Sequence, residues 1–144
     1  MDAILVVNAG SSSVKFELFE AKGQAALARL IKGQIDGIGA RPRLRAAGSD
    51  GTVLIDETYA PATVPDVAVA LRKAGTWLRD THSLEPVAVG HRVVHGGPRY
   101  DRPVLIDAGV LAELERYVPL APLHQPNNLA PIRALLALSP DVPQ

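Results

Sequence analysis

The sequence contains no cysteine, and its 15 Lys and Arg residues are balanced by 15 Asp and Glu residues. Without cysteine, disulfides and thiolate metal sites are excluded. Balanced charge gives no indication of a nucleic-acid partner or of an anionic membrane surface. No apolar stretch approaches transmembrane length, and the N-terminus "MDAILVV" lacks the basic region and the apolar length of a signal peptide. These absences predict a cytoplasmic protein with no nucleic-acid or membrane partner.

The chain has 144 residues, of which 47% are hydrophobic, enough for a real core. This length suits one domain or part of a larger protein. The C-terminal segment "ALLALSPDVPQ" ends a helical pattern, and neither a closing strand nor a charged tail follows it. We therefore expect the chain to be incomplete.

The first half of the chain has the pattern of β-strands. Residues 3–7 form a continuous apolar run, which is typical of a strand buried on both faces. Over residues 14–18 apolar and charged side chains alternate, which predicts a half-buried strand and hence a β-hairpin with the first. Further elements are expected as a turn at 20–23, a strand at 25–35, a short positively charged edge strand at 41–48, a turn at 49–51 and a strand at 52–59.

The second half changes to a helical period. A helix is predicted after Asp66 as its N-cap, then a buried strand over residues 86–97, then a helix after Asp107. A proline-bound loop and a last helix opened by Asn127 or Asn128 follow. Strands first, then helices around one more strand, predict an α/β domain whose mixed sheet begins with antiparallel hairpins.

The segment "NAGSSSVK", residues 8–15, follows the first strand. It lacks the second glycine of a Walker loop and the final glycine of a hydrolase nucleophile elbow, so both motifs fail. A hairpin turn with small hydroxyls and exposed N–H groups can bind an anion, with Asn8 suited to an Mg²⁺-bound water and Lys15 to phosphate. A plain polar turn explains the same composition.

The segment "GHRVVHGG" places two histidines, His91 and His95, four residues apart. That spacing chelates zinc on a helix, whereas on a strand it spans about 13 Å, so we reject a zinc site. Strand alternation puts Arg92 and Val94 on one side and the histidines on the other. An arginine near the end of an apolar strand needs an anion, which is either a ligand carboxylate or phosphate or an internal carboxylate.

The segment "LAPLHQPNN" presents His124 between Pro122 and Pro126. Prolines fix the backbone and lower the entropy cost of presenting a side chain. The alternative is a histidine that hydrogen-bonds its own loop.

Together, "LVVNAGSSSVKFELF", "VGHRVVHGGPRY" and "PLAPLHQPNN" resemble acetate kinase, in this order and at similar separations. The resemblance implies the sugar kinase, Hsp70 and actin superfamily, with two ribonuclease H-like α/β domains around an ATP cleft. Acetate kinases are much longer than this chain. The resemblance thus implies that residues 1–144 are the N-terminal domain without its last core strand, and that the second, nucleotide-binding domain is absent.

On the nucleotide side, the resemblance assigns four residues. Asn8 matches an asparagine that helps to place Mg²⁺ and the phosphates of ATP. Ser11 and Ser13 match serines of the phosphate loop, and Lys15 matches a lysine assigned to nucleotide binding.

On the acceptor side, Arg92 matches the arginine that binds the substrate carboxylate and helps to neutralise the transferring phosphoryl group. Val94 and Leu123 match the apolar pocket around the acetate methyl, and His124 matches an active-site histidine. We expect structural roles for the other two histidines of this region.

The implied reaction is Mg²⁺-dependent, in-line transfer of the ATP γ-phosphoryl group to acetate, giving acetyl phosphate and ADP. A propionate or butyrate kinase is the related alternative, and a non-catalytic module that binds nucleotide or a protein partner is the alternative of another class. The full-length protein is expected to be a homodimer, and the 144-residue chain alone is expected to be inactive.

Overall fold

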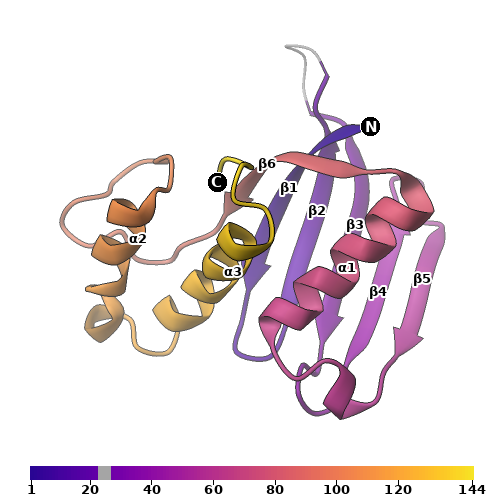
Figure 1. Cartoon of the computed structure of the whole chain (residues 1–144), viewed down its shortest axis with the longest axis horizontal. Coiled ribbons are helices and arrows are strands. Elements are labelled where there is room, and N and C mark those ends of the chain that lie inside the picture. The colour runs from indigo at the N-terminus through magenta and orange to yellow at the C-terminus, as the bar shows by residue number, and fades with distance from the viewer. Residues whose placement is uncertain (23–26) are drawn as a thin grey trace.

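The computed structural model describes residues 1–22 and 27–144 and contains one six-stranded mixed sheet with helices (Figure 1). The strands are β1 (Asp2–Ala9), β2 (Val14–Glu20), β3 (Arg29–Asp36), β4 (Arg43–Gly48), β5 (Val53–Thr58) and β6 (Glu85–His91). The helices are α1 (Val67–His82), α2 (Ala108–Glu115) and α3 (Gln125–Leu138), with short 3-10 turns η1 (Pro61–Thr63) and η2 (Val118–Leu120). The predicted turn at 20–23 and strand at 25–35 fall partly outside the described residues, and the strand begins at Arg29.

The strand order is β5-β4-β3-β2-β1-β6. Strands β1 to β5 form an antiparallel meander, whereas β6 pairs in parallel with β1 after the chain has crossed over through α1. A parallel neighbour requires such a crossover. The predicted mixed α/β fold that begins with antiparallel hairpins is therefore confirmed.

The predicted edge position of β4 is wrong, because β5 pairs along its outer side. The arginines of β4 face carboxylates of both neighbouring strands instead of solvent alone. Arg43 Nε donates to Asp56 Oδ1 at 2.8 Å, and Arg45 NH2 donates to Asp36 Oδ2 at 3.0 Å. Opposite charges on adjacent strands favour this pairing.

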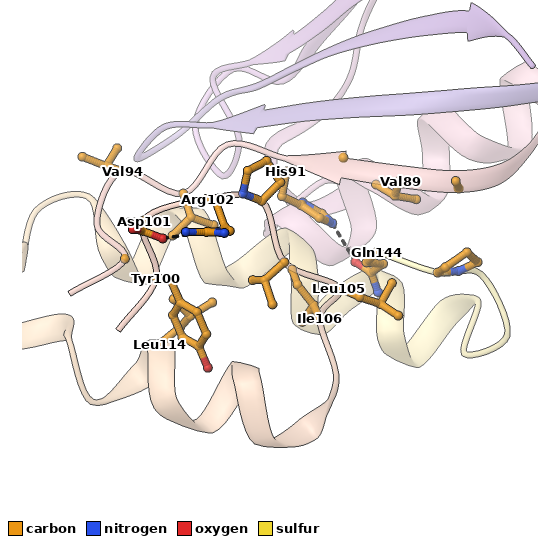
Figure 2. Close-up of a pocket in the computed structure, with 17 residues that line it drawn as sticks. Val89, His91, Val94, Tyr100, Asp101, Arg102, Leu105, Ile106, Leu114 and Gln144 are labelled. Atoms are coloured by element: carbon orange, nitrogen blue, oxygen red, sulfur yellow. Dashed lines mark hydrogen bonds and ion pairs between the residues drawn. The ribbon is translucent and has the colours of Figure 1, made fainter. Parts of the chain in front are cut away.

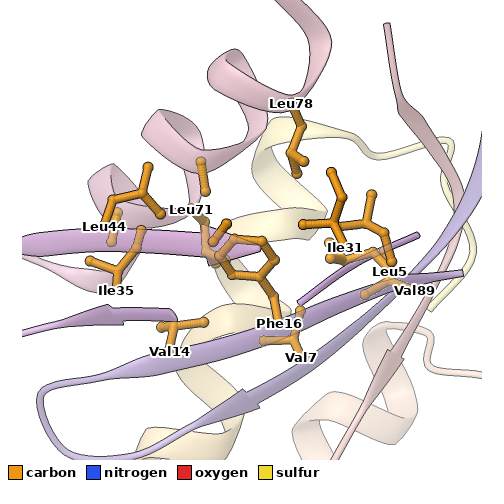
Figure 3. Packing of buried hydrophobic residues seen from close by; sticks show 14 of the residues in the cluster. Leu5, Val7, Val14, Phe16, Ile31, Ile35, Leu44, Leu71, Leu78 and Val89 are labelled. Carbon is orange, nitrogen blue, oxygen red and sulfur yellow. The ribbon is translucent and has the colours of Figure 1, made fainter. Parts of the chain in front are cut away.

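The main core lies between the sheet and the helices α1 and α3, which cover the same face (Figures 1 and 3). The predicted alternation in β2 is confirmed, because Val14, Phe16 and Leu18 are all at most 3% exposed. Helix α1 starts as predicted, with the Asp66 carboxylate accepting from the Val69 N–H at 2.9 Å.

Burial of β1 on both faces is not observed. Its side chains alternate, and Val6 remains 39% exposed because the two helices cover only one face of the sheet. The apolar run predicts the strand correctly, but it does not predict that one face of the strand is partly exposed.

A second, smaller core lies between α2 and α3, to one side of the sheet, and contains Leu114, Tyr117, Leu129 and Ile132 (Figure 1). The Asp107 cap of α2 is confirmed, since its carboxylate accepts from the Val110 N–H at 2.8 Å. Across residues 1–22 and 27–144, no helix is long and apolar enough to cross a bilayer.

The last helix starts earlier than predicted. Helix α3 begins at Gln125, with Pro126 in its first turn, so Asn127 and Asn128 lie inside the helix. Proline is favoured in the first turn because its missing N–H has no partner there anyway. The proline that suggested a loop is instead part of a helix start.

Gly33 of β3 provides a test of the packing over β2. It pairs with Phe16, and a Cβ at position 33 would collide with the Phe16 ring. We expect Gly33→Ala to lower the free energy of unfolding by about 1–3 kcal/mol, because overpacking strains a core. Urea denaturation measures this change.

Gly75→Ala is the matched control. A methyl group at position 75, within α1, would meet no atom within 4 Å, so alanine there should stabilise by about 0.5–1 kcal/mol. Equal effects would contradict the packing.

Candidate functional site at the carboxyl edge of β1 and β6

The predicted site residues gather where β1 and β6 end. Because the two strands are parallel, their carboxyl ends meet at one edge of the sheet, with Val7 opposite His91. The pairing continues one residue further, since the Arg92 N–H donates to the Val7 carbonyl at 3.1 Å. The segment after β1 and the segment after β6 therefore leave the sheet side by side.

The segment after β1 is the predicted hairpin turn. The Gly10 N–H donates to the Ser13 carbonyl at 2.8 Å, and the Ile38 N–H donates to the Ser12 carbonyl at 3.0 Å. A Cβ at position 10 would lie 3.2 Å from Ser13 Oγ, so this hydroxyl lies close over the glycine. The backbone of the turn is thus fixed at both ends.

The polar side chains of this turn are available to a ligand. Asn8 is half-buried and pairs in register with Lys15, which is exposed, as is Ser11. Within the described part of the chain, no hydrogen bond or ion pair engages the side chains of Asn8, Ser11, Ser13 or Lys15. Their oxygens and the ammonium group can therefore receive phosphate or cation-bound water.

The predicted strand over residues 86–97 is too long. The predicted alternation continues in exposure, with Arg92 and Val94 exposed and Val93 and His95 half-buried, but strand β6 ends at His91 and the chain leaves the sheet after Arg92. The reason is a tertiary hydrogen bond, because the Val94 N–H donates to the side chain of Asn128 at 2.9 Å. Arg92 is exposed, and no carboxylate among the described residues forms an ion pair with it. Its guanidinium is thus free to meet an external anion.

The two histidines have separate partners. His91 Nε2 lies 2.6 Å from Gln144 Oε1, as Figure 2 shows, and His95 Nδ1 accepts from the Gly97 N–H at 2.8 Å. These intramolecular bonds support the structural roles expected for both. Residue groups of three or more His, Cys, Asp or Glu that could hold a metal are absent from the described residues.

The third segment is the start of α3. Leu123 is 79% exposed, and His124, also exposed, precedes the first helical residue. The His124 carbonyl accepts from the Asn128 N–H at 3.0 Å, and the Leu123 carbonyl accepts from Asn127 Nδ2 at 3.0 Å. The predicted loop is thus present over residues 121–124, and it gives way to the helix at Gln125.

One residue that the sequence pattern did not single out for this site joins all three segments. Asn128 is 4% exposed, its Oδ1 accepts from the Val94 N–H at 2.9 Å, and its Nδ2 donates to the Ala9 carbonyl at 3.2 Å. The available signal was its position, because Gln125 and Asn128 lie on the same helical stripe as Leu129. Amides on an apolar stripe indicate internal hydrogen bonds.

A hollow with a volume of about 750 Å³ lies beside β6 (Figure 2). His91, Val94, Leu105, Leu114 and Gln144 are among its lining residues. Of the predicted site residues, all of which the structure describes, only Val94 borders it. Lys15 borders a separate hollow of about 550 Å³, whose lining includes Arg45 of β4 and Asp56 of β5. Ser11, Arg92, Leu123 and His124 are exposed, so the chain does not enclose the predicted residues in one cavity.

The fold is a mixed α/β sheet flanked by helices, with exposed polar segments at the carboxyl ends of the parallel neighbours β1 and β6. A profile of the Acetokinase family matches residues 3–144. An acetate kinase of Nitrobacter hamburgensis is 66% identical over all 144 residues, and one of Rhizobium meliloti is 60% identical over the same length. The chain therefore belongs to the Acetokinase family.

Solved structures agree with this assignment. The acetate kinase of Porphyromonas gingivalis superimposes with a TM-score of 0.85 at 31% identity, and a propionate kinase of Francisella tularensis with a TM-score of 0.84 at 31% identity. Both comparisons cover the whole of this chain and 36% of the other. The chain likewise spans 36% of the length of the acetate kinases of Nitrobacter hamburgensis and Rhizobium meliloti.

The half-buried His91 predicts a pH dependence of stability. Burial lowers the pKa of His91, and the hydrogen bond with Gln144 opposes that shift only in part. The folded state therefore favours the neutral imidazole, and the unfolded chain binds the proton first. The resulting stability is present above the unfolded pKa of about 6.5 and is lost as the pH falls below it.

Urea denaturation between about pH 7.5 and pH 5.5 measures this effect. We expect the free energy of unfolding to fall more steeply in the wild type than in His91→Gln, which cannot titrate. Equal slopes would show that His91 is not the source.

Proposed function

We propose that the full-length protein transfers the γ-phosphoryl group of ATP to acetate, and that residues 1–144 supply its N-terminal part. The observation that carries this proposal is the meeting of two segments at one sheet edge. The serine turn leaves β1, and Arg92 leaves β6 with its N–H bonded to the Val7 carbonyl at 3.1 Å. A turn with exposed hydroxyl groups, beside an arginine that forms no ion pair with the described residues, suits a reaction between two anions.

Arg92 would meet the main barrier of this reaction. A carboxylate is a weak nucleophile, and its charge repels the γ-phosphate, so catalysis depends on positioning and charge neutralisation. A planar guanidinium can bind a carboxylate and a phosphoryl oxygen with separate N–H groups. Its position just beyond the end of β6 fixes its backbone while leaving its side chain able to reach both anions.

The nucleotide phosphates would lie against the serine turn. Ser11 and Ser13 would donate hydroxyl hydrogens to phosphate oxygens, and Lys15 would add a positive charge. Mg²⁺ prefers hard oxygen ligands and keeps several of its waters, so the free amide of Asn8 fits a water-mediated contact. When bound, the ion would neutralise charge on the phosphates.

The acceptor would lie between the segments after β6 and before α3. Val94 and Leu123 are 47% and 79% exposed, and we propose that they contact the methyl group of acetate. His124 would lie near the transferring phosphoryl group. Closure by the remainder of the protein would exclude water from this site.

The domain boundary is also a proposal. The Val89 N–H of β6 donates to the Pro143 carbonyl at 2.9 Å, on the side of β6 that does not pair with β1. We propose that the following residues continue along this edge as a further core strand, and that a second, nucleotide-binding domain follows. We also propose a cytoplasmic homodimer for the full-length protein.

A propionate kinase is the second candidate, because the Francisella tularensis propionate kinase superimposes nearly as well as the acetate kinase structure. One methylene changes the discrimination between substrates by only about 1–3 kcal/mol. We therefore expect the same protein to phosphorylate both acids, at different rates. A module that binds nucleotide without turnover is the candidate of another class.

Assay of the full-length protein with ATP, Mg²⁺ and acetate, propionate or butyrate tests the proposed function. We expect acyl phosphate, trapped as hydroxamate, with the highest kcat/KM for acetate. Residues 1–144 alone should give none, because the site is open and only one side of it is present. Higher kcat/KM for propionate would favour the second candidate. No product with any acid would favour the non-catalytic module, and product from the fragment would contradict its predicted inactivity.

Arg92→Ala in the full-length protein should separate catalysis from stability. Because Arg92 is exposed and without an ion pair in the described region, we expect the melting temperature to change little and kcat/KM to fall by at least about 10²-fold. Arg102→Ala is the matched control, since Arg102 is also exposed and, among the described residues, its side chain hydrogen-bonds only the adjacent Asp101, at 3.0 Å. A loss of stability in place of turnover would indicate a structural role for Arg92.

A further inference from the structure

Asn128 is placed to control the distance between the two sides of the proposed site. Its side chain bonds the backbone of both segments, through Val94 on the acceptor side and Ala9 on the phosphate side. Its own N–H bonds the His124 carbonyl at 3.0 Å, which adds the start of α3. The three bonds converge on one buried residue.

We propose that Asn128 is a positioning residue that keeps Arg92 and Val94 in register with the phosphate-binding turn. This inference rests on the proposed function. Arg92 lies two residues before the bonded Val94 N–H, and Asn8 directly precedes the bonded Ala9 carbonyl, so the two hydrogen bonds fix the backbone beside both groups. A shift of either segment changes the distance between the acceptor and the phosphoryl group.

The bond to Val94 has no substitute within the described sheet. Strand β6 has ended at His91, so no neighbouring strand there can accept the Val94 N–H. Removing the Asn128 amide would leave the Val94 N–H without an acceptor. It would also remove one hydrogen bond from the Ala9 carbonyl. The segment after β6 could then move relative to β1, and a displacement of about 1 Å can lower a rate by about 10²-fold.

Gln125 is a second buried amide on α3, and its hydrogen bonds hold the helix to neighbouring segments. It is fully buried, and its Nε2 donates to the His95 carbonyl at 3.0 Å and to the Leu114 carbonyl at 3.1 Å. These bonds attach α3 to α2 and to His95 in the segment after β6, and neither reaches the phosphate-binding turn. Gln125→Leu is therefore a control for loss of a buried amide.

Steady-state kinetics of the full-length protein provide the test. Asn128→Leu should lower kcat/KM for acetate by about 10²-fold, with a higher KM and a lower kcat. Asn128→Asp retains the acceptor for the Val94 N–H and loses the donor to the Ala9 carbonyl. It should therefore restore the acetate KM toward the wild-type value while kcat stays low.

Two matched variants complete the kinetic test. Arg133→Leu, on the same helix, should leave kcat and KM close to wild type, because its guanidinium bonds the exposed Glu115 of α2. Gln125→Leu should lower the melting temperature without the same change in acetate KM. The proposal is overturned if Asn128→Leu changes only the melting temperature, or if all three leucine variants change KM and kcat alike.

Hydrogen exchange of the full-length protein tests the link without using activity. The Val94 amide should be protected in the wild type and in Asn128→Asp and should exchange faster in Asn128→Leu. Unchanged protection in the leucine variant would overturn the proposal. If the wild type phosphorylates no carboxylate, the proposed function fails, and the exchange experiment still decides whether Asn128 holds the two segments together.

Discussion

The parallel pairing of β1 with β6 is the constraint on which the rest of the arrangement depends. It sends two segments that are about eighty positions apart in sequence out of the same edge of the sheet. The pairing requires a crossover, and α1 provides it while packing over β2, whereas α3 packs over β1. Without this register, the serine turn and Arg92 would lie on different sides of the molecule.

Local patterns predicted the elements whose environment is local. The alternation over residues 14–18 indicated the buried face of β2, and Asp66 and Asp107 marked the starts of their helices, since each carboxylate caps an N–H three residues on. The serine turn was predicted from composition alone. Its association with the segment after β6 came from the family resemblance, because sequence spacing does not specify which strands pair.

Two of the failures share a physical cause, which is that partners distant in the sequence decide where a strand ends or which position it takes in the sheet. The strand pattern "VAVGHRVV" continues beyond His91, but the Val94 N–H bonds Asn128 and leaves the ladder. The positive charges of β4 suggested an edge, but Asp36 and Asp56 on the flanking strands neutralise them. The proline after Gln125 suggested a loop, yet a first helical turn tolerates it equally well.

The site combines an ordered backbone with exposed side chains. Its backbone is fixed by hydrogen bonds at Val7, Ala9 and Val94, whereas most of its chemical groups are exposed. Fixed backbone lowers the entropy cost of ligand binding, but exposed charges are screened by water and interact weakly. Strong interaction with two anions requires a cover that removes water. Because Leu123 and Val94 present apolar surface beside these charges, a cover over this edge would gain hydrophobic burial and strengthen the electrostatics together.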